Sequence, residues 1–136
     1  SYINAAAAFD FELVIACPAG FDPASYLVEA NRDRVSIVRD PTVGATGVDL
    51  VVTDVWASMG QEAQQRKRED AFVGFEVDTE LMSKAKSNAL FMHCLPAHRG
   101  EEVSAEVLDH EGSVVWDEAE NRMHSQKALL EHLLSS

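Results

Sequence analysis

Short apolar runs alternate with longer segments of helical character along the whole chain. The expected strands are residues 11–17, 35–38, 48–53, 89–92 and 114–116, and the expected helices are 2–9, 23–33, 61–72, 79–85, 105–108 and 118–134. Residues 40–47 are expected to form turns, because Pro and Gly interrupt them. Alternating strands and helices predict a parallel sheet with helices on both faces and right-handed connections. The predicted fold class is therefore α/β, a doubly wound parallel sheet of the Rossmann-like, three-layer kind.

Composition excludes several classes of partner. The chain has 136 residues, enough for one domain with its own core, and its formal net charge of −12 argues against binding to nucleic acid or to an anionic membrane. No apolar run is long enough to span a bilayer. Two cysteines, Cys17 and Cys94, do not make a disulfide framework, so a cytoplasmic setting is expected.

The stretch 89–100 is the first candidate for a functional site. Its apolar run stops abruptly at the sequence His93-Cys94-Leu95-Pro96, where the proline cannot donate a hydrogen bond to a neighbouring strand. A histidine, a cysteine and two free carbonyl groups are thus expected at the carboxyl end of a strand. In open α/β sheets ligands bind at that edge.

A second polar segment, Asp54 to Gly60, follows another expected strand. Parallel strands end at the same edge, so Asp54, Ser58 and Cys94 are expected to converge there. Asp54, expected among apolar neighbours, would suit a ligand ammonium group, Ser58 adds a hydroxyl, and the N–H groups of Met59 and Gly60 could hold a carboxylate. An α-amino acid needs this combination. Asp54 could equally cap a turn.

Other side chains have simpler interpretations. Cys94 alone is more often a small buried hydrophobic residue than a nucleophile. His93, Cys94 and His98 do not have the spacing of a four-ligand zinc site, so no metal is expected. Arg122 lies near the start of the expected helix 118–134, where a cation is disfavoured, which suggests that an anionic ligand holds it.

Three segments together resemble the ornithine carbamoyltransferase family. They are Asp-Val-Trp-Ala-Ser-Met-Gly at 54–60, His-Cys-Leu-Pro at 93–96 and Glu-Ala-Glu-Asn-Arg at 118–122, in the family's order and with similar intervals. Residues 14–18 also look like the second strand of that family's ornithine-binding domain. The resemblance covers essentially the whole chain, and the Ser-Met-Gly form looks like the ornithine-using branch.

The resemblance implies carbamoyl transfer from carbamoyl phosphate to L-ornithine, giving L-citrulline and phosphate in arginine metabolism. Asp54 and Ser58 would bind the α-ammonium group of ornithine, and the Met59 N–H its α-carboxylate. Cys94 would lie beside the attacking amine and orient or deprotonate it.

The remaining implied roles concern the carbamoyl group. The carbonyl groups of Cys94 and Leu95 would accept hydrogen bonds from its NH₂, and Pro96 would hold those carbonyls in place. Arg122 would point at the carbamoyl oxygen, where negative charge develops. The implied catalytic residues are thus Cys94, Arg122 and Asp54, with no cofactor, no metal and no covalent intermediate.

The resemblance also indicates what the chain lacks. Residues 1–136 are expected to be a single ornithine-binding domain truncated at its N-terminus, without the carbamoyl-phosphate domain and its Ser-Thr-Arg-Thr loop. The family's first central strand, with a Gly-Asp-Gly-Asn-Asn turn, has no counterpart, so a gap is expected between the strands 11–17 and 48–53. The isolated fragment is expected to be inactive, and the full-length enzyme to be a homo-oligomer, as the trimeric family implies.

Two other functions remain open. The chain could be a non-catalytic amino-acid-binding module derived from that domain. It could also be the dinucleotide-binding domain of an oxidoreductase, although it contains no Gly-x-Gly-x-x-Gly sequence.

Overall fold

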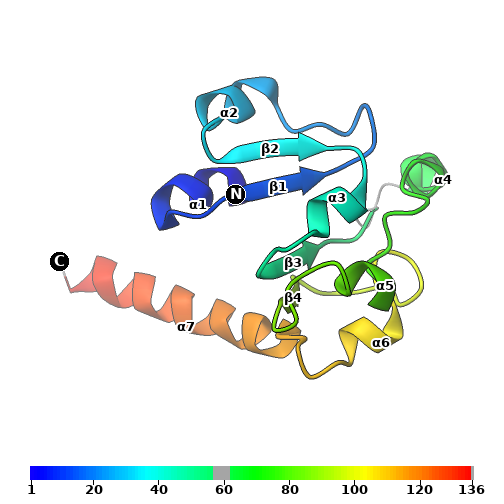
Figure 1. The fold of residues 1–136 in the computed structure, drawn as a ribbon. Coiled ribbons are helices and arrows are strands. Elements are labelled where there is room, and N and C mark those ends of the chain that lie inside the picture. Colours follow the sequence, from blue (N-terminus) through cyan, green and yellow to red (C-terminus); the bar gives the residue numbers. More distant parts are fainter. Residues whose placement is uncertain (57–61, 136) are drawn as a thin grey trace.

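The computed structural model describes residues 1–56 and 62–135, with the backbone alone for residues 62–65. In chain order the elements are α1 (Tyr2–Phe9), β1 (Leu13–Ala16), α2 (Ser25–Ala30), β2 (Val35–Val38), α3 (Pro41–Ala45), β3 (Leu50–Thr53), α4 (Glu62–Ala71), α5 (Thr79–Met82), β4 (Leu90–His93), α6 (Ala105–Leu108) and α7 (Val115–Leu134). Strands and helices alternate as predicted (Figure 1). None of the helices in this described part is both long and apolar enough to cross a membrane.

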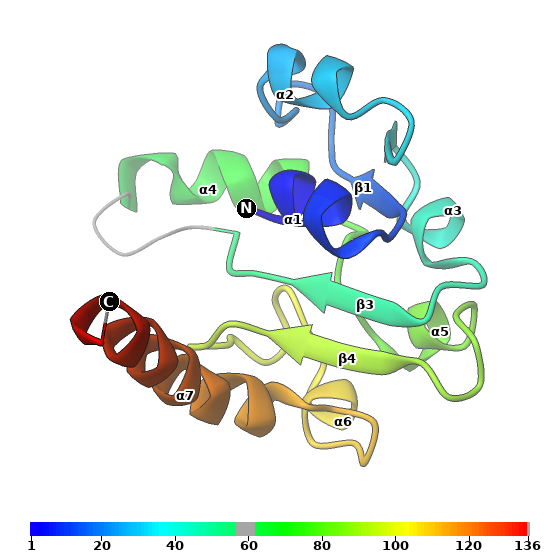
Figure 2. The ribbon, with the colours of Figure 1, turned by 90° about the vertical axis from the view of Figure 1, so that its left-hand side faces the viewer.

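The strands form two separate parallel pairs. β1 pairs with β2, with Leu13 opposite Val35, and β3 pairs with β4, with Leu50 opposite Leu90. No hydrogen-bonded ladder joins β1 to β3, so the sheet is interrupted at the place where the gap was expected. Figures 1 and 2 show the two pairs lying one above the other. The α/β class with a missing central strand is confirmed.

Two helix starts differ from the prediction. Residues 41–45 form helix α3 where turns were expected, because the Asp40 side chain accepts a hydrogen bond from the Thr42 N–H at 2.8 Å and Pro41 occupies the first helical position. Asp22 does not cap the next helix, which begins only at Ser25. Its carboxylate instead pairs with Arg39 at 2.6 Å.

The predicted strand 114–116 is wrong. Helix α7 begins at Val115, three residues before the expected start, and only a single bridge joins the preceding chain to β4, between Ser113 and Phe91. A fifth strand would need several successive hydrogen bonds to β4. The last hydrogen bond from this segment to β4 is the one that the Val114 N–H donates to the Phe91 carbonyl at 2.9 Å, and the helix begins at the next residue. Arg122 therefore lies two turns inside α7 and not at its start.

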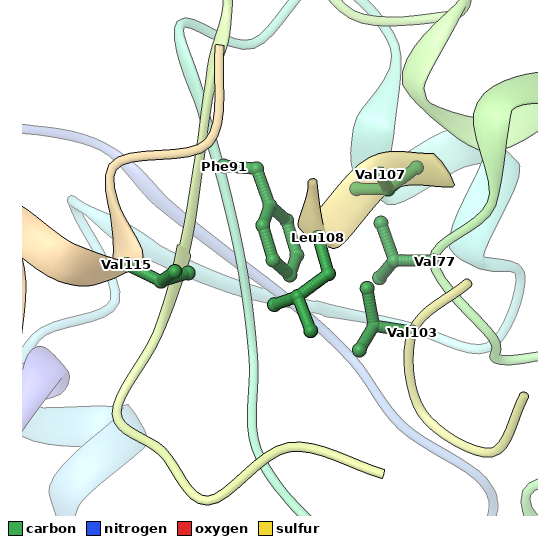
Figure 3. Close-up of a cluster of buried hydrophobic side chains, with 6 residues drawn as sticks. All are labelled: Val77, Phe91, Val103, Val107, Leu108 and Val115. Atoms are coloured by element: carbon green, nitrogen blue, oxygen red, sulfur yellow. The ribbon is translucent and has the colours of Figure 1, made fainter. Parts of the chain in front are cut away.

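The larger core lies on one face of β4. It consists of Val77, Phe91, Val103, Val107, Leu108 and Val115, and Figure 3 shows the Phe91 ring facing Leu108. A smaller core joins α1 to the other strand pair through Ile3, Ala6 and Val35. Burying one such apolar side chain contributes about 1.5–3 kcal/mol, so the larger cluster holds the end of β4 in place.

An aromatic group connects the two halves. The Phe72 ring, just after α4, lies 5.0 Å from the Phe21 ring, which follows β1, and 5.8 Å from the Trp56 ring, which follows β3. Arg68 donates to the Trp56 carbonyl at 3.2 Å. Contacts beyond the carboxyl ends of the strands thus link the two pairs, although no ladder does.

Candidate functional site

The carboxyl ends of β3 and β4 bring Asp54 and Cys94 together. Thr53 lies opposite His93 in the parallel register, so the next residue of each strand leaves the sheet at the same edge. The Cys94 thiol donates a hydrogen bond to Asp54 Oδ1, with Sγ and Oδ1 3.1 Å apart. The expected convergence of these two residues is confirmed. Ser58 and Met59 lie outside the described residues.

The thiol of Cys94 is held in its protonated form. Desolvation raises its pKa from 9.0 to about 11, although the residue as a whole is exposed, and the hydrogen bond to Asp54 and the negative charges of Asp54 and Glu118 act in the same direction. At neutral pH the side chain is therefore a hydrogen-bond donor. It is not a thiolate nucleophile, and it is a poor general base.

Asp54 is exposed in this chain. Its Oδ1 accepts from the Val55 N–H at 2.7 Å as well as from the Cys94 thiol. The turn-capping interpretation and the binding-site interpretation are thus both compatible with the geometry. Oδ1 thus accepts two hydrogen bonds from described residues.

A buried pair supports the chain immediately after Cys94. His93 Nδ1 accepts a hydrogen bond from the Leu95 N–H at 2.9 Å, so the ring proton lies on Nε2 and is donated to Glu102 Oε1 at 3.0 Å. His93 and Glu102 are both fully buried. Leu95 has a left-handed φ of 54°, and the Leu95–Pro96 peptide bond is cis. Sequence reasoning did not find Glu102, because no local pattern pairs it with a histidine nine positions earlier.

Arg122 faces the same region from α7. It lines an open hollow of about 840 Å³, and the other lining residues are Cys94, Leu95, Pro96, Ala119, Met123, Gln126, Lys127 and Leu130. Within the described part of the chain, the Arg122 guanidinium forms no ion pair. Arg122 thus lines the same hollow as Cys94 and Leu95. The argument that placed it at a helix start is wrong, because α7 begins at Val115.

Two further residues were missed by sequence reasoning. The pKa of the Tyr2 phenol is raised, first by burial and then by electrostatic interaction with Glu118, Cys94 and Asp54, which places α1 beside the site. Glu118 Oε2 is buried, and none of the described residues forms a hydrogen bond with it. The carboxylates of Asp54 and Glu118 thus create a negative potential at this edge, and Arg122 supplies the opposite charge. This distribution suits a ligand that carries both an ammonium group and a group with partial negative charge.

Comparison with known proteins supports the resemblance. Residues 1–133 match the family described as Aspartate/ornithine carbamoyltransferase, Asp/Orn binding domain. Ornithine carbamoyltransferase from Hydrogenovibrio crunogenus is 62% identical over 135 residues, which are 99% of this chain and 45% of that protein. The chain thus spans less than half the length of this relative.

Solved structures show the same fold. Anabolic ornithine carbamoyltransferase from Campylobacter jejuni superposes with a TM-score of 0.91 at 35% identity, covering 99% of this chain and 47% of that one. The enzyme from Burkholderia thailandensis gives 0.85 at 48% identity, covering 98% and 42%. The chain belongs to the aspartate/ornithine carbamoyltransferase family and matches its Asp/Orn binding domain.

Proposed function

We propose that this chain is the ornithine-binding domain of an ornithine carbamoyltransferase, which transfers the carbamoyl group of carbamoyl phosphate to L-ornithine and releases L-citrulline and phosphate. The observation that carries the proposal is the Cys94–Asp54 contact at the sheet edge, with Arg122 on the same hollow. Relatives that match over nearly the whole chain bear that name, which supports the same reaction.

One part of the proposed site binds the amino-acid end of ornithine. Asp54 and Ser58 hold the α-ammonium group, and the Met59 N–H holds the α-carboxylate. The negative potential around Asp54 and Glu118 supports the choice of a cationic ligand. Asp54 also fixes the Cys94 thiol, so substrate binding and thiol orientation depend on one carboxylate.

The other part serves the reacting groups. A thiol with a pKa of about 11 positions the attacking amine and does not take its proton, which refines the role expected for Cys94. The carbonyls of Cys94 and Leu95 accept hydrogen bonds from the carbamoyl NH₂, and His93 steadies Leu95 through its N–H. Arg122 stabilises the carbamoyl oxygen as negative charge develops. Rate enhancement comes from positioning and electrostatics.

The rest of the enzyme lies outside this chain in our proposal. A second domain supplies the carbamoyl-phosphate site, and the 136-residue chain alone is inactive. The complete enzyme is a homo-oligomer, either a trimer or a multiple of a trimer. Support comes from the 45% coverage of the relative and from the interrupted sheet. Two free cysteines are consistent with a cytoplasmic setting.

The test is citrulline formation by the complete protein that carries this chain. Arg122→Ala should lower kcat by about 100-fold or more, roughly 3 kcal/mol of transition-state stabilisation, as for one oxyanion donor. Ornithine affinity should change much less. Lys86→Ala is the matched control, because Lys86 pairs with Asp49 at the opposite edge of the sheet. Ornithine binding without citrulline formation by the unmodified protein would instead identify a binding module, and normal turnover in Arg122→Ala would reassign that residue.

A further inference from the structure

The turn between β4 and α6 gathers three side chains that the proposed reaction does not use as ligands. His98 Nδ1 lies 3.4 Å from Glu101 Oε2 and 4.0 Å from Glu102 Oε2. The three ligand atoms all lie within 4.8 Å of one another. Arg99 lies in the same turn, but its guanidinium forms an ion pair with Asp109 at 2.8 Å.

The buried carboxylate of Glu102 is only half satisfied. Its Oε1 accepts from His93 Nε2 at 3.0 Å and from the His98 N–H at 2.7 Å. Its Oε2 is buried and has no hydrogen-bond partner among the residues that the structure describes. A buried carboxylate oxygen without a partner is costly, so the second oxygen requires a positively charged or hydrogen-bonding group beside it. Glu102 Oε2 lies 4.0 Å from His98 Nδ1, so one group placed between these two atoms could contact both.

The spacing of the cluster fits a first-row divalent metal. Zinc binds histidine nitrogen at about 2.0–2.1 Å and carboxylate oxygen at about 2.0–2.2 Å, so two ligands of one ion lie roughly 3–4 Å apart. The distances from His98 Nδ1 fall in that range. The side chains of His98 and Glu101 are 50% and 44% exposed, so two of the three ligands are open to solvent.

We propose that His98 Nδ1, Glu101 Oε2 and Glu102 Oε2 form a binding site for one divalent transition-metal ion, of the kind that zinc occupies with water as its fourth ligand. Two carboxylates balance the charge of the ion, and Glu102 receives the outer hydrogen bonds that metal-binding carboxylates usually have. The proposal goes beyond the carbamoyltransferase reaction and replaces the expectation that the chain has no metal site.

The site has a structural consequence for the neighbouring segment. Glu102 links it to His93, and His93 accepts from the Leu95 N–H. An ion on Oε2 would therefore fix the carboxylate that orients the His93 ring. Metal occupancy and the position of Leu95 are coupled through two hydrogen bonds, whereas the reaction itself needs no metal.

The test is calorimetric titration of the metal-stripped complete protein that carries this chain with zinc chloride, in a Cys94→Ser background that removes the exposed thiol as a competing ligand. One ion per chain is expected. His98→Ala and Glu101→Gln should each weaken zinc affinity at least about tenfold, since loss of even an outer partner of a metal ligand costs roughly 10–100-fold. Both replaced side chains are substantially exposed, so circular dichroism should show the folded spectrum to be unchanged.

His124→Ala is the matched control. His124 pairs with Glu120 at 3.2 Å on exposed α7 and lacks a buried third ligand, so its replacement should leave zinc affinity unchanged. The proposal is overturned if zinc does not bind in the Cys94→Ser background, or if binding there is equally strong after His98→Ala and Glu101→Gln. In either case the three side chains form a surface contact cluster without a metal ion.

Discussion

The raised pKa of Cys94 can be measured directly, and Asp54→Asn is the informative perturbation. The shift from 9.0 to about 11 corresponds to two pKa units, so the thiolate fraction at neutral pH is about 100-fold lower than that of an ordinary cysteine. Asn removes the negative charge that opposes the thiolate, while the desolvation of the thiol remains. The pKa of Cys94 should therefore fall toward 9 without reaching it.

The assay is the rate of alkylation by iodoacetamide as a function of pH, in a Cys17→Ala background so that only Cys94 reacts. The midpoint should lie near pH 11 with Asp54 present and at lower pH in Asp54→Asn. Asp49→Asn is the matched control, because Asp49 precedes β3 at the opposite edge and pairs with Lys86. A midpoint near 9 with Asp54 present, or one that does not move in Asp54→Asn, would refute the assignment.

The same shift has a consequence for stability. The folded-state pKa is higher than the unfolded value, so folding favours the protonated thiol. This contribution is fully present below pH 9 and is lost as the pH rises toward 11. The free energy of unfolding should decline across that window, and more steeply than in Cys94→Ser. Because Cys94 is largely exposed, the effect on stability should be small compared with the change in thiol reactivity.

Two further predictions concern binding and the core. In the complete enzyme, Asp54→Asn should weaken ornithine and its unreactive analogue norvaline alike in calorimetry, because both carry the α-ammonium group; a loss confined to ornithine would place Asp54 at the reacting amine. Phe91→Ala should lower the free energy of unfolding by about 3–5 kcal/mol in urea titrations, because the ring is buried in the larger core. Leu90→Ala, at the neighbouring exposed position, should cost much less, and equal losses would contradict the burial argument.

Sequence reasoning predicted elements whose signals are local. The α1 bounds at 2–9 and the β2 bounds at 35–38 are as predicted, and Ser104 caps α6 by accepting from the Val107 N–H at 3.2 Å. Asp78 likewise caps α5 by accepting from the Leu81 N–H at 2.8 Å. Caps and apolar runs act within a few residues, so the sequence contains the whole interaction.

Errors occurred where distant contacts compete with local preference. Asp22 has a good capping position, but Arg39, seventeen residues away, takes its carboxylate, and the helix begins later. The apolar residues at 114–116 resemble a strand, but Val115 fits the core between β4 and α6 as the first residue of a helix. In both cases a tertiary contact outweighs a preference worth about 1 kcal/mol or less.

The amino-acid sequence by itself determined the fold class and the meeting of Asp54 with Cys94, and its resemblance to a known family added the interruption of the sheet. Alternating apolar runs require parallel strands, and parallel strands end at one edge. Only the tertiary structure decided the protonation state of Cys94, the His93–Glu102 pair and the approach of Arg122 from inside a helix. These features depend on burial and on distances between residues far apart in the chain. Local sequence patterns carry no information about either quantity.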